Sequence, residues 1–225
     1  MTDRVTEFAR KNLKNKKDFG EDARLAFRRH LDDLKRSKKK DPNFPYTFNV
    51  EKSEDIIELA NKLTIAEGEG NESFTCVGFQ EFILGSLFGW VHKETGKRRF
   101  TDSYVQVSRQ QGKSVLNAIL GIKCSNFDNY NYGQIYCTAT KADQARIVLN
   151  EITKFIRADK DLEELFDIKD YKNEITGKIT STVIRALGRD THTIDGFRPY
   201  LGIVDEYHAH KDNQMYKLLK GGTRK

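Results

Sequence analysis

The sequence of 225 residues has few cysteines, few prolines and no long hydrophobic run. Its three cysteines, Cys76, Cys124 and Cys137, are odd in number, lie far apart and each stand next to apolar residues. This pattern favours buried thiols in a reducing compartment over a disulfide framework or a metal site. No apolar run approaches the roughly 18 residues that a membrane span requires, and the N-terminus lacks the apolar core of a signal peptide. We therefore expect a soluble, cytoplasmic protein.

Charge, by contrast, is abundant. Charged residues make up 32% of the sequence against 37% hydrophobic residues, and the mean hydropathy is -0.68. The net charge of +6 is unevenly spread, because residues 1–45 contain 14 Lys and Arg against 8 Asp and Glu, whereas the rest of the chain is balanced at 25 against 25. A segment this basic either attracts the phosphate backbone of a nucleic acid or is simply a solvated helix surface.

Two domains are predicted, a basic helical segment over residues 1–45 and a larger α/β domain over residues 46–225. In the first, apolar residues recur among many charges, which predicts a helical hairpin interrupted near residues 18–20. Pro42 and Pro45, two of the three prolines, mark the boundary. An extended tether is expected there, because each proline disfavours helix at the residue before it.

Helix and turn patterns fill the first part of the larger domain. Ser53 is expected to cap a helix that ends in the glycine-bearing loop EGEGNES at residues 67–73. Residues 79–90 predict an apolar helix, most of which packs in a core. A charged turn at residues 92–99, with Gly96 at its tip, indicates a hairpin.

The second part alternates strand and helix. Residues 134–140 predict a short buried strand, and the apolar residues of 142–156 recur with the period of a helix. A strand followed by a helix implies a parallel sheet with crossover connections. Residues 178–187 are also rich in strand formers. The continuous apolar run at 201–204 suits a central strand that is covered on both faces.

The stretch from Tyr104 to Cys124 has the strand, loop and helix order of a phosphate-binding P-loop. In such a loop the backbone N–H groups and the helix N-terminus face the phosphates. Gly112 allows close backbone approach, Lys113 reaches the β and γ oxygens, and Ser114 can ligate Mg²⁺. The first glycine of the consensus is replaced by Val107. The other residues expected to bind nucleotide are Ser108, Arg109, Gln110 and Gln111.

Two acidic residues, Asp205 and Glu206, follow the apolar run at 201–204 directly. Ligands of open α/β sheets bind beyond the carboxyl ends of the strands, so both carboxylates are predicted to face the P-loop although 92 residues separate Asp205 from Lys113. The strand must stop before the pair for both acids to work there. Asp205 would then hold Mg²⁺, and Glu206 would orient and polarise the attacking water. A pair that merely caps the next helix is the alternative interpretation.

Gln80 is a further candidate, because it lies off the apolar face predicted for residues 79–90. Its carboxamide has one donor end and one acceptor end, which matches the N6 and N7 edge of adenine. An ordinary surface glutamine is the alternative.

Together these motifs resemble the N-terminal ATPase portion of a bacteriophage terminase large subunit, the motor that packages DNA into a procapsid. The resemblance rests on FQEFILGSLFGW, YVQVSRQQGKS, QIYCTATKADQARIV and TIDGFRPYLGIVDEYHAH, and it covers most of residues 46–225. Members of this family often lack the first Walker A glycine and carry an arginine in that loop, as Val107 and Arg109 do here. Gly78 stands where many relatives have a proline.

The resemblance implies an α/β P-loop NTPase fold of the RecA-like (ASCE) class, with a central, mostly parallel sheet flanked by helices and preceded by a helical N-terminal segment. It also implies ATP and Mg²⁺ as cofactors, with duplex DNA, a small terminase subunit and the portal protein as partners, in a homo-oligomeric ring. Glu206, Lys113 and Arg109 would be catalytic, and Arg189 or Arg198 would act in a neighbouring subunit. The nuclease domain of the family is not in this sequence, so no DNA cleavage is expected.

Two alternatives stay open. The letters DEYH at residues 205–208 also fit the Asp-Glu-x-His box of some helicases. Helicases of that type normally keep the first Walker A glycine, and a second ATPase lobe would have to follow. The other alternative is a catalytically silent DNA-binding or partner-binding remnant that inherited the motifs without using them.

Overall fold

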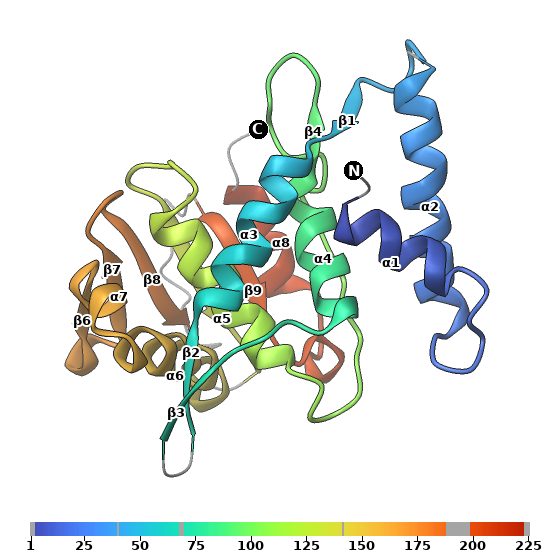
Figure 1. Cartoon of the computed structure of the whole chain (residues 1–225). Coiled ribbons are helices and arrows are strands. Elements are labelled where there is room, and N and C mark those ends of the chain that lie inside the picture. Colours follow the sequence, from blue (N-terminus) through green and yellow to red (C-terminus); the bar gives the residue numbers. More distant parts are fainter. Residues whose placement is uncertain (1–2, 40, 68–69, 141, 188–198, 223–225) are drawn as a thin grey trace. The chain divides into compact units, whose positions relative to one another are not determined.

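The computed structural model describes residues 3–39, 41–67, 70–140, 142–187 and 199–222 (Figure 1). The chain divides into two compact units. Unit 1 comprises Met1–Lys62 and Phe74–Gln106, and unit 2 comprises Leu63–Ser73 and Val107–Lys225. The N-terminal helices therefore share a unit with later residues, and the units part at other positions than the predicted boundary at residue 45.

Unit 1 is mainly helical, and its N-terminal hairpin of helices is as predicted. Its elements are α1 (Arg4–Asn12), α2 (Glu21–Lys38), β1 (Tyr46–Phe48), α3 (Val50–Lys62), α4 (Gly78–Gly89) and β4 (Trp90–His92). Strands β1 and β4 pair antiparallel, and the predicted turn follows β4, where the Gly96 amide donates to the His92 carbonyl at 2.9 Å. The predicted cap of α3 is wrong, because Asn49 Oδ1 accepts from the Lys52 amide at 2.9 Å and Ser53 is buried inside the helix.

Helix α4 packs so closely against its neighbours that it needs a residue without a side chain at Gly85. A Cβ atom there would lie 2.4 Å from Cγ2 of Val5 on α1 and 2.5 Å from Oγ of Ser53 on α3. At Gly85 the backbone of α4 therefore contacts side chains of α1 and α3 directly, which a residue with a side chain would prevent.

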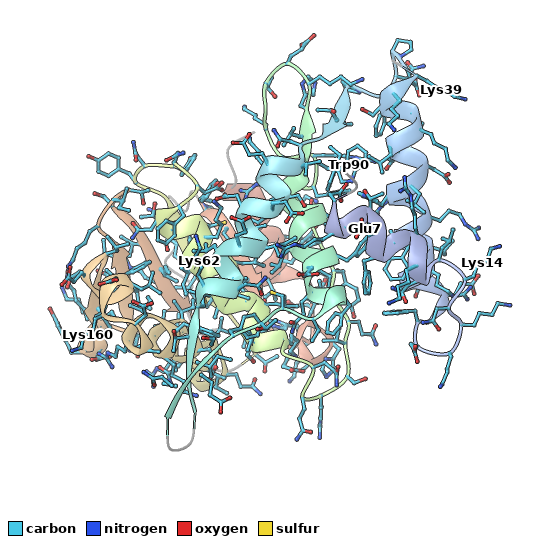
Figure 2. The ribbon with its side chains drawn as sticks, in the orientation of Figure 1. Glu7, Lys14, Lys39, Lys62, Trp90 and Lys160 are labelled. Carbon is cyan, nitrogen blue, oxygen red and sulfur yellow. The ribbon has the colours of Figure 1, made fainter. Side chains whose placement is uncertain are left out.

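A chain of hydrogen bonds crosses the core of unit 1. Burial lowers the pKa of His30 to about 4, so its ring is neutral at pH 7. Trp90, labelled in Figure 2, donates from Nε1 to His30 Nδ1 at 3.0 Å. The ring proton must therefore be on Nε2, which donates to Thr6 Oγ1 at 2.9 Å. Thr6 in turn donates to Asp3 at 2.8 Å, and Asp3 caps α1 by accepting from the Thr6 amide. Each of these buried polar groups has a partner.

Unit 2 contains a five-stranded sheet and the helices that pack on it. Its elements are β2 (Thr64–Glu67), β3 (Gly70–Ser73), α5 (Lys113–Asn126), β5 (Gln134–Thr138), α6 (Ala142–Ala158), α7 (Lys160–Glu164), β6 (Phe166–Lys169), β7 (Glu174–Gly177), β8 (Thr182–Leu187), β9 (Pro199–Val204) and α8 (Gln214–Gly222), with short 3-10 helices at Asp170–Lys172 and Tyr207–Ala209. The strand order is β6-β7-β8-β5-β9. The apolar residues predicted for the buried face of α6, from Ala145 to Ile156, are buried.

The sheet is mixed rather than mostly parallel. Strand β5 runs parallel to β8 and β9, but β6 with β7 and β7 with β8 are antiparallel. Among the described strands, β9 is an edge strand of the sheet, so it is not the central strand that its apolar run predicted. Only residues 178–181 separate β7 from β8. Parallel neighbours need a long crossover connection, so a link this short favours antiparallel pairing of these two strands.

Two further local predictions are wrong. The strand expected at residues 104–107 has no regular secondary structure. Its β-branched residues favour a strand, but a strand forms only where a neighbour pairs with its backbone. The loop expected at residues 67–73 instead contains strand β3, which pairs antiparallel with β2 and whose exposed residues Gly70–Ser73 give little sequence signal. Among the described helices, none is long and apolar enough to cross a membrane.

Candidate functional site

Strand β9 delivers the acidic pair to the carboxyl edge of the sheet. It pairs in parallel with β5 up to the partners Thr138 and Val204. The Asp205 amide then donates to the Thr138 carbonyl at 2.8 Å, after which Glu206 adopts a left-handed backbone with φ 48° and the chain turns into the 3-10 helix. The strand therefore stops before the acidic pair, as predicted.

The predicted phosphate loop leads into α5 through two left-handed residues. Gly112 is the N-cap of α5 with φ 73°, a conformation that glycine adopts at little cost. Gln110 has φ 62°, which is uncommon for a residue with a side chain. The four residues before Gly112 are exposed and lie at the surface ahead of a helix of 14 residues. The exposed loop residues are Ser108, Arg109, Gln110 and Gln111.

Lys113, the first residue of α5, joins these two parts of unit 2. Its Nζ lies 3.3 Å from Asp205 Oδ1 and donates a hydrogen bond to Glu206 Oε1. The Asp205 side chain is 11% exposed, whereas those of Lys113 and Glu206 are each 34% exposed. The predicted approach of the lysine to both carboxylates is thus present, in a position that solvent reaches.

The opposite charges at this site stabilise one another. Burial lowers the pKa of Lys113, but the hydrogen bond to Glu206 and the charge of Asp205 outweigh burial and raise it above its ordinary value. The hydrogen bond from Lys113 is also the main reason why the pKa of Glu206 lies below its ordinary value. The charges of His208 and Arg109 add to this effect, against desolvation. Near neutral pH, Lys113 and Glu206 are therefore both charged.

His208 is a neighbour of Glu206, a contact that the sequence did not predict. Its Nδ1 lies 3.4 Å from Glu206 Oε2, so Glu206 contacts Lys113 through one oxygen and His208 through the other. The imidazole is 75% exposed. The signal was present in DEYH, because a histidine two residues after a turning glutamate can reach back to it.

The alternative interpretation of Gln80, an ordinary surface glutamine, is wrong. Gln80 belongs to unit 1, is 5% exposed and is one of the buried residues of α4, as are Phe82, Leu84 and Phe88. Its Oε1 accepts from the Val77 amide at 3.1 Å at the start of α4. A contact with adenine stays a prediction.

The remaining predicted site residues lie as follows. Ser114 is the second residue of α5 and is half-buried, and its role towards Mg²⁺ stays a prediction. Arg189 and Arg198 lie outside the described residues.

The chemistry of the site fits a cation bound with phosphate. Asp205 and Glu206 already accommodate the ammonium group of Lys113 between them. Mg²⁺ prefers such oxygen ligands and usually takes one or two carboxylates together with phosphate oxygens. Within the described ranges, no three His, Cys, Asp or Glu side chains gather as a metal site built from protein alone would need. Asp205 and Ser114 are the oxygen donors that could hold Mg²⁺ here, and the N-terminus of α5 suits phosphate.

Comparison with known proteins identifies the family. Residues 78–225 match the family model described as "Terminase large subunit, ATPase domain". The chain belongs to this family. The match covers well over half of the chain and includes α4, the loop before α5 and the acidic pair after β9. It confirms the terminase resemblance and favours it over the helicase alternative.

A solved structure, the crystal structure of the HK97 bacteriophage large terminase, has a similar fold. The TM-score is 0.65 at 20% sequence identity, and the similarity covers 76% of this chain and 34% of that chain. At this identity the likeness concerns the fold alone, and this chain spans about a third of that protein's length. A comparison with curated proteins found no match.

Proposed function

We propose that this chain is the ATP-hydrolysing motor portion of a phage terminase large subunit, with a P-loop NTPase fold of the RecA-like class. The observation that carries the proposal is the contact of Lys113 with Asp205 and Glu206, which come from opposite ends of unit 2 in sequence. P-loop enzymes use a lysine, a metal-binding acid and a water-orienting residue around one nucleotide.

The proposed roles follow from the chemistry of each side chain. Lys113 and the backbone amides of the loop would bind the phosphates, and Gln80 would contact adenine. Asp205 and Ser114 would hold Mg²⁺, which when bound neutralises charge on the phosphates. Arg109, whose charge lowers the pKa of Glu206, would add positive charge near the reacting groups.

Glu206 would orient the attacking water. Its lowered pKa keeps it an acceptor at neutral pH. The ammonium of Lys113 has three donors, of which one is bound to Glu206 in this structure while Asp205 Oδ1 lies 3.3 Å away. Phosphate oxygens would therefore compete with Glu206 for Lys113. Binding of the nucleotide would then release the Glu206 carboxylate for its role in hydrolysis.

We also propose the setting of this activity. In the host cytoplasm, a homo-oligomeric ring of the complete subunit would move duplex DNA, with the small terminase subunit and the portal protein as partners. The family membership supports this setting.

The test is steady-state ATP hydrolysis by the chain and by Glu206→Gln, with and without duplex DNA. We expect turnover that DNA stimulates, and a loss of about 10²–10⁴-fold in the variant, as for the removal of a catalytic base. The control is Glu163→Gln, which removes an exposed carboxylate of α7 and should leave turnover unchanged. ATP binding without turnover by the unsubstituted chain would instead support the silent remnant. Equal turnover by the chain and by Glu206→Gln would refute the assigned role of Glu206.

A further inference from the structure

Five cations gather over the last turn of α1 and the link that joins it to α2. This segment, residues 10–17, is called the basic turn here. Its cations are Arg10, Lys11, Lys14, Lys16 and Lys17, all of them exposed, and no acidic residue interrupts them in sequence. Figure 2 labels Lys14 on this turn.

These cations differ from others in unit 1 in their surroundings. Arg4 pairs with Glu54 and Glu81, and Lys35 pairs with Asp32. In the part of the chain that the structure describes, no carboxylate lies within ion-pair distance of any cation of the basic turn. These cations therefore face solvent and are not paired with neighbouring carboxylates.

The backbone of the basic turn is held by side-chain hydrogen bonds. Asn12 Nδ2 donates to the Phe8 carbonyl at 3.0 Å. Asn15 Nδ2 donates to Asn12 Oδ1 at 3.2 Å and to Asp18 Oδ2 at 2.9 Å, while Asn15 Oδ1 accepts from the Asp18 amide at 3.2 Å. The cations therefore extend from an ordered turn.

Aromatic rings anchor the same turn to the core of unit 1. Phe19 packs edge-on against Phe8 and Phe27, with ring centroids 5.7 Å and 5.2 Å apart. Phe27 is buried and also contacts Phe82 of α4 at 4.8 Å. A surface that is already ordered loses less entropy when it binds a partner.

The nearby carboxylates have other roles, and Glu7 lies in the first turn of α1, where its charge stabilises the helix N-terminus. Asp18 is bound by Asn15 within the turn. Glu21 and Asp22 lie in the first turn of α2, whose Gly20 cap provides no side-chain hydrogen bond. Negative charge there stabilises the helix N-terminus.

We propose that the basic turn binds the phosphate backbone of nucleic acid. A polyanion requires only cations from its partner, whereas a stable protein interface is usually centred on buried aromatic or apolar anchors. Among described residues 3–39, Leu25 of α2 is the one exposed large hydrophobic side chain, at 48%, and it lies outside the basic turn. The choice of duplex DNA as the nucleic acid rests on the proposed packaging function.

The test measures binding of a fluorescent DNA duplex to the full chain by anisotropy, over a series of KCl concentrations. The variant replaces Lys14, Lys16 and Lys17 with glutamine. For three lost phosphate contacts, the slope of log affinity against log salt should become shallower by about 2.7. The control replaces the exposed Lys62, Lys97 and Lys160 with glutamine, which changes net charge equally.

Several outcomes would overturn the proposal. One is an unchanged slope in the triple variant, and another is an equal change of slope in the control. A third is a triple variant that still binds DNA normally but no longer binds polyglutamate, an acidic polypeptide, because the basic turn would then recognise protein carboxylates. Thermal melting verifies folding, and Lys14→Gln alone, with an expected change of about 0.9, replaces the triple variant if that fails to fold. ATP turnover without DNA should be the same in all variants. A chain that lacks turnover but shows the expected slopes would therefore refute the motor and leave the basic turn in place.

Discussion

Unit 1 encloses one of its ion pairs, Arg99 with Asp33, whereas the candidate site of unit 2 keeps its paired charges part-exposed. In unit 1, Arg99 Nη1 donates to Asp33 at 2.6 Å, with side chains 17% and 7% exposed, and the guanidinium lies 5.4 Å from the Trp90 ring centroid. In unit 2, Lys113 and Glu206 are each 34% exposed. The first pair is enclosed by protein and serves the framework. The second lies where phosphate and Mg²⁺ could replace its partners.

The largest effect is expected from breaking the enclosed pair of unit 1. Arg99→Met should lower the free energy of unfolding by about 3–5 kcal/mol, because it leaves the Asp33 carboxylate buried without its closest cation. Arg36 also pairs with Asp33, at 3.7 Å, but is 47% exposed. Arg36→Ala should therefore cost no more than about 1 kcal/mol. Urea denaturation measures both variants, and equal losses would remove the contrast between enclosed and exposed charge.

The counterpart in unit 2 is Lys113→Ala, which should affect chemistry more than folding. ATP turnover should fall by about 10²–10³-fold, the range typical for one preorganised electrostatic contact in a reaction. Its urea midpoint should change little, because the lysine is part-exposed. Lys160→Ala on α7 is the matched control. A variant that hydrolyses ATP normally but unfolds easily would place Lys113 in the framework instead.

A third effect concerns pH and belongs to unit 1. The unfolded chain protonates His30 below pH 6.5, but the folded chain resists protonation until about pH 4. Stability should therefore decrease as the pH falls between these values, by at most about 3 kcal/mol. Urea unfolding followed by the fluorescence of Trp90, which donates to His30, measures this loss at pH 7 and pH 5. In His30→Asn the decrease should be smaller, and an equal decrease would assign it to other groups.

The smallest effect is expected at the close contact between α1, α3 and α4. Gly85→Ala should cost about 1–3 kcal/mol, because the new methyl group meets Val5 and Ser53 in a packed interior. Gly70→Ala is the control, since its Cβ would meet nothing within 4 Å. Thermal melting compares the two, and an unaffected Gly85→Ala would show that the helices can move apart at little cost.

The sequence carried more information about the candidate site than about the sheet around it. Lys113 and the acidic pair could be predicted because each stands at the end of a regular element, where direction follows from local pattern. The mixed sheet could not be predicted so well, since its partners are chosen by connection length and neighbours. Strand β9 illustrates this, because the same apolar run that placed Asp205 correctly gave the wrong position within the sheet.

Side-chain detail escaped prediction for a related reason. Ser53 and Asn49 are both suitable helix caps, and only the hydrogen bond from Lys52 to Asn49 decides between them. Gln80 was expected to lie off the apolar face of its helix, yet it is buried at the start of α4, where its acceptor is bound by the Val77 amide. Tertiary packing determines both the cap of α3 and the burial of Gln80, and it cannot be read from a single sequence.

The central claim is that Lys113 and Glu206 belong to one nucleotide site. Its most direct test is equilibrium binding of a fluorescent, non-hydrolysable ATP analogue with Mg²⁺ to the chain, to Glu206→Gln and to Lys113→Ala. Removing the negative charge of Glu206 frees donors of Lys113 for phosphate, so we predict tighter binding by Glu206→Gln and much weaker binding by Lys113→Ala. Unchanged or weaker binding by Glu206→Gln, together with normal binding by Lys113→Ala, would contradict the claim.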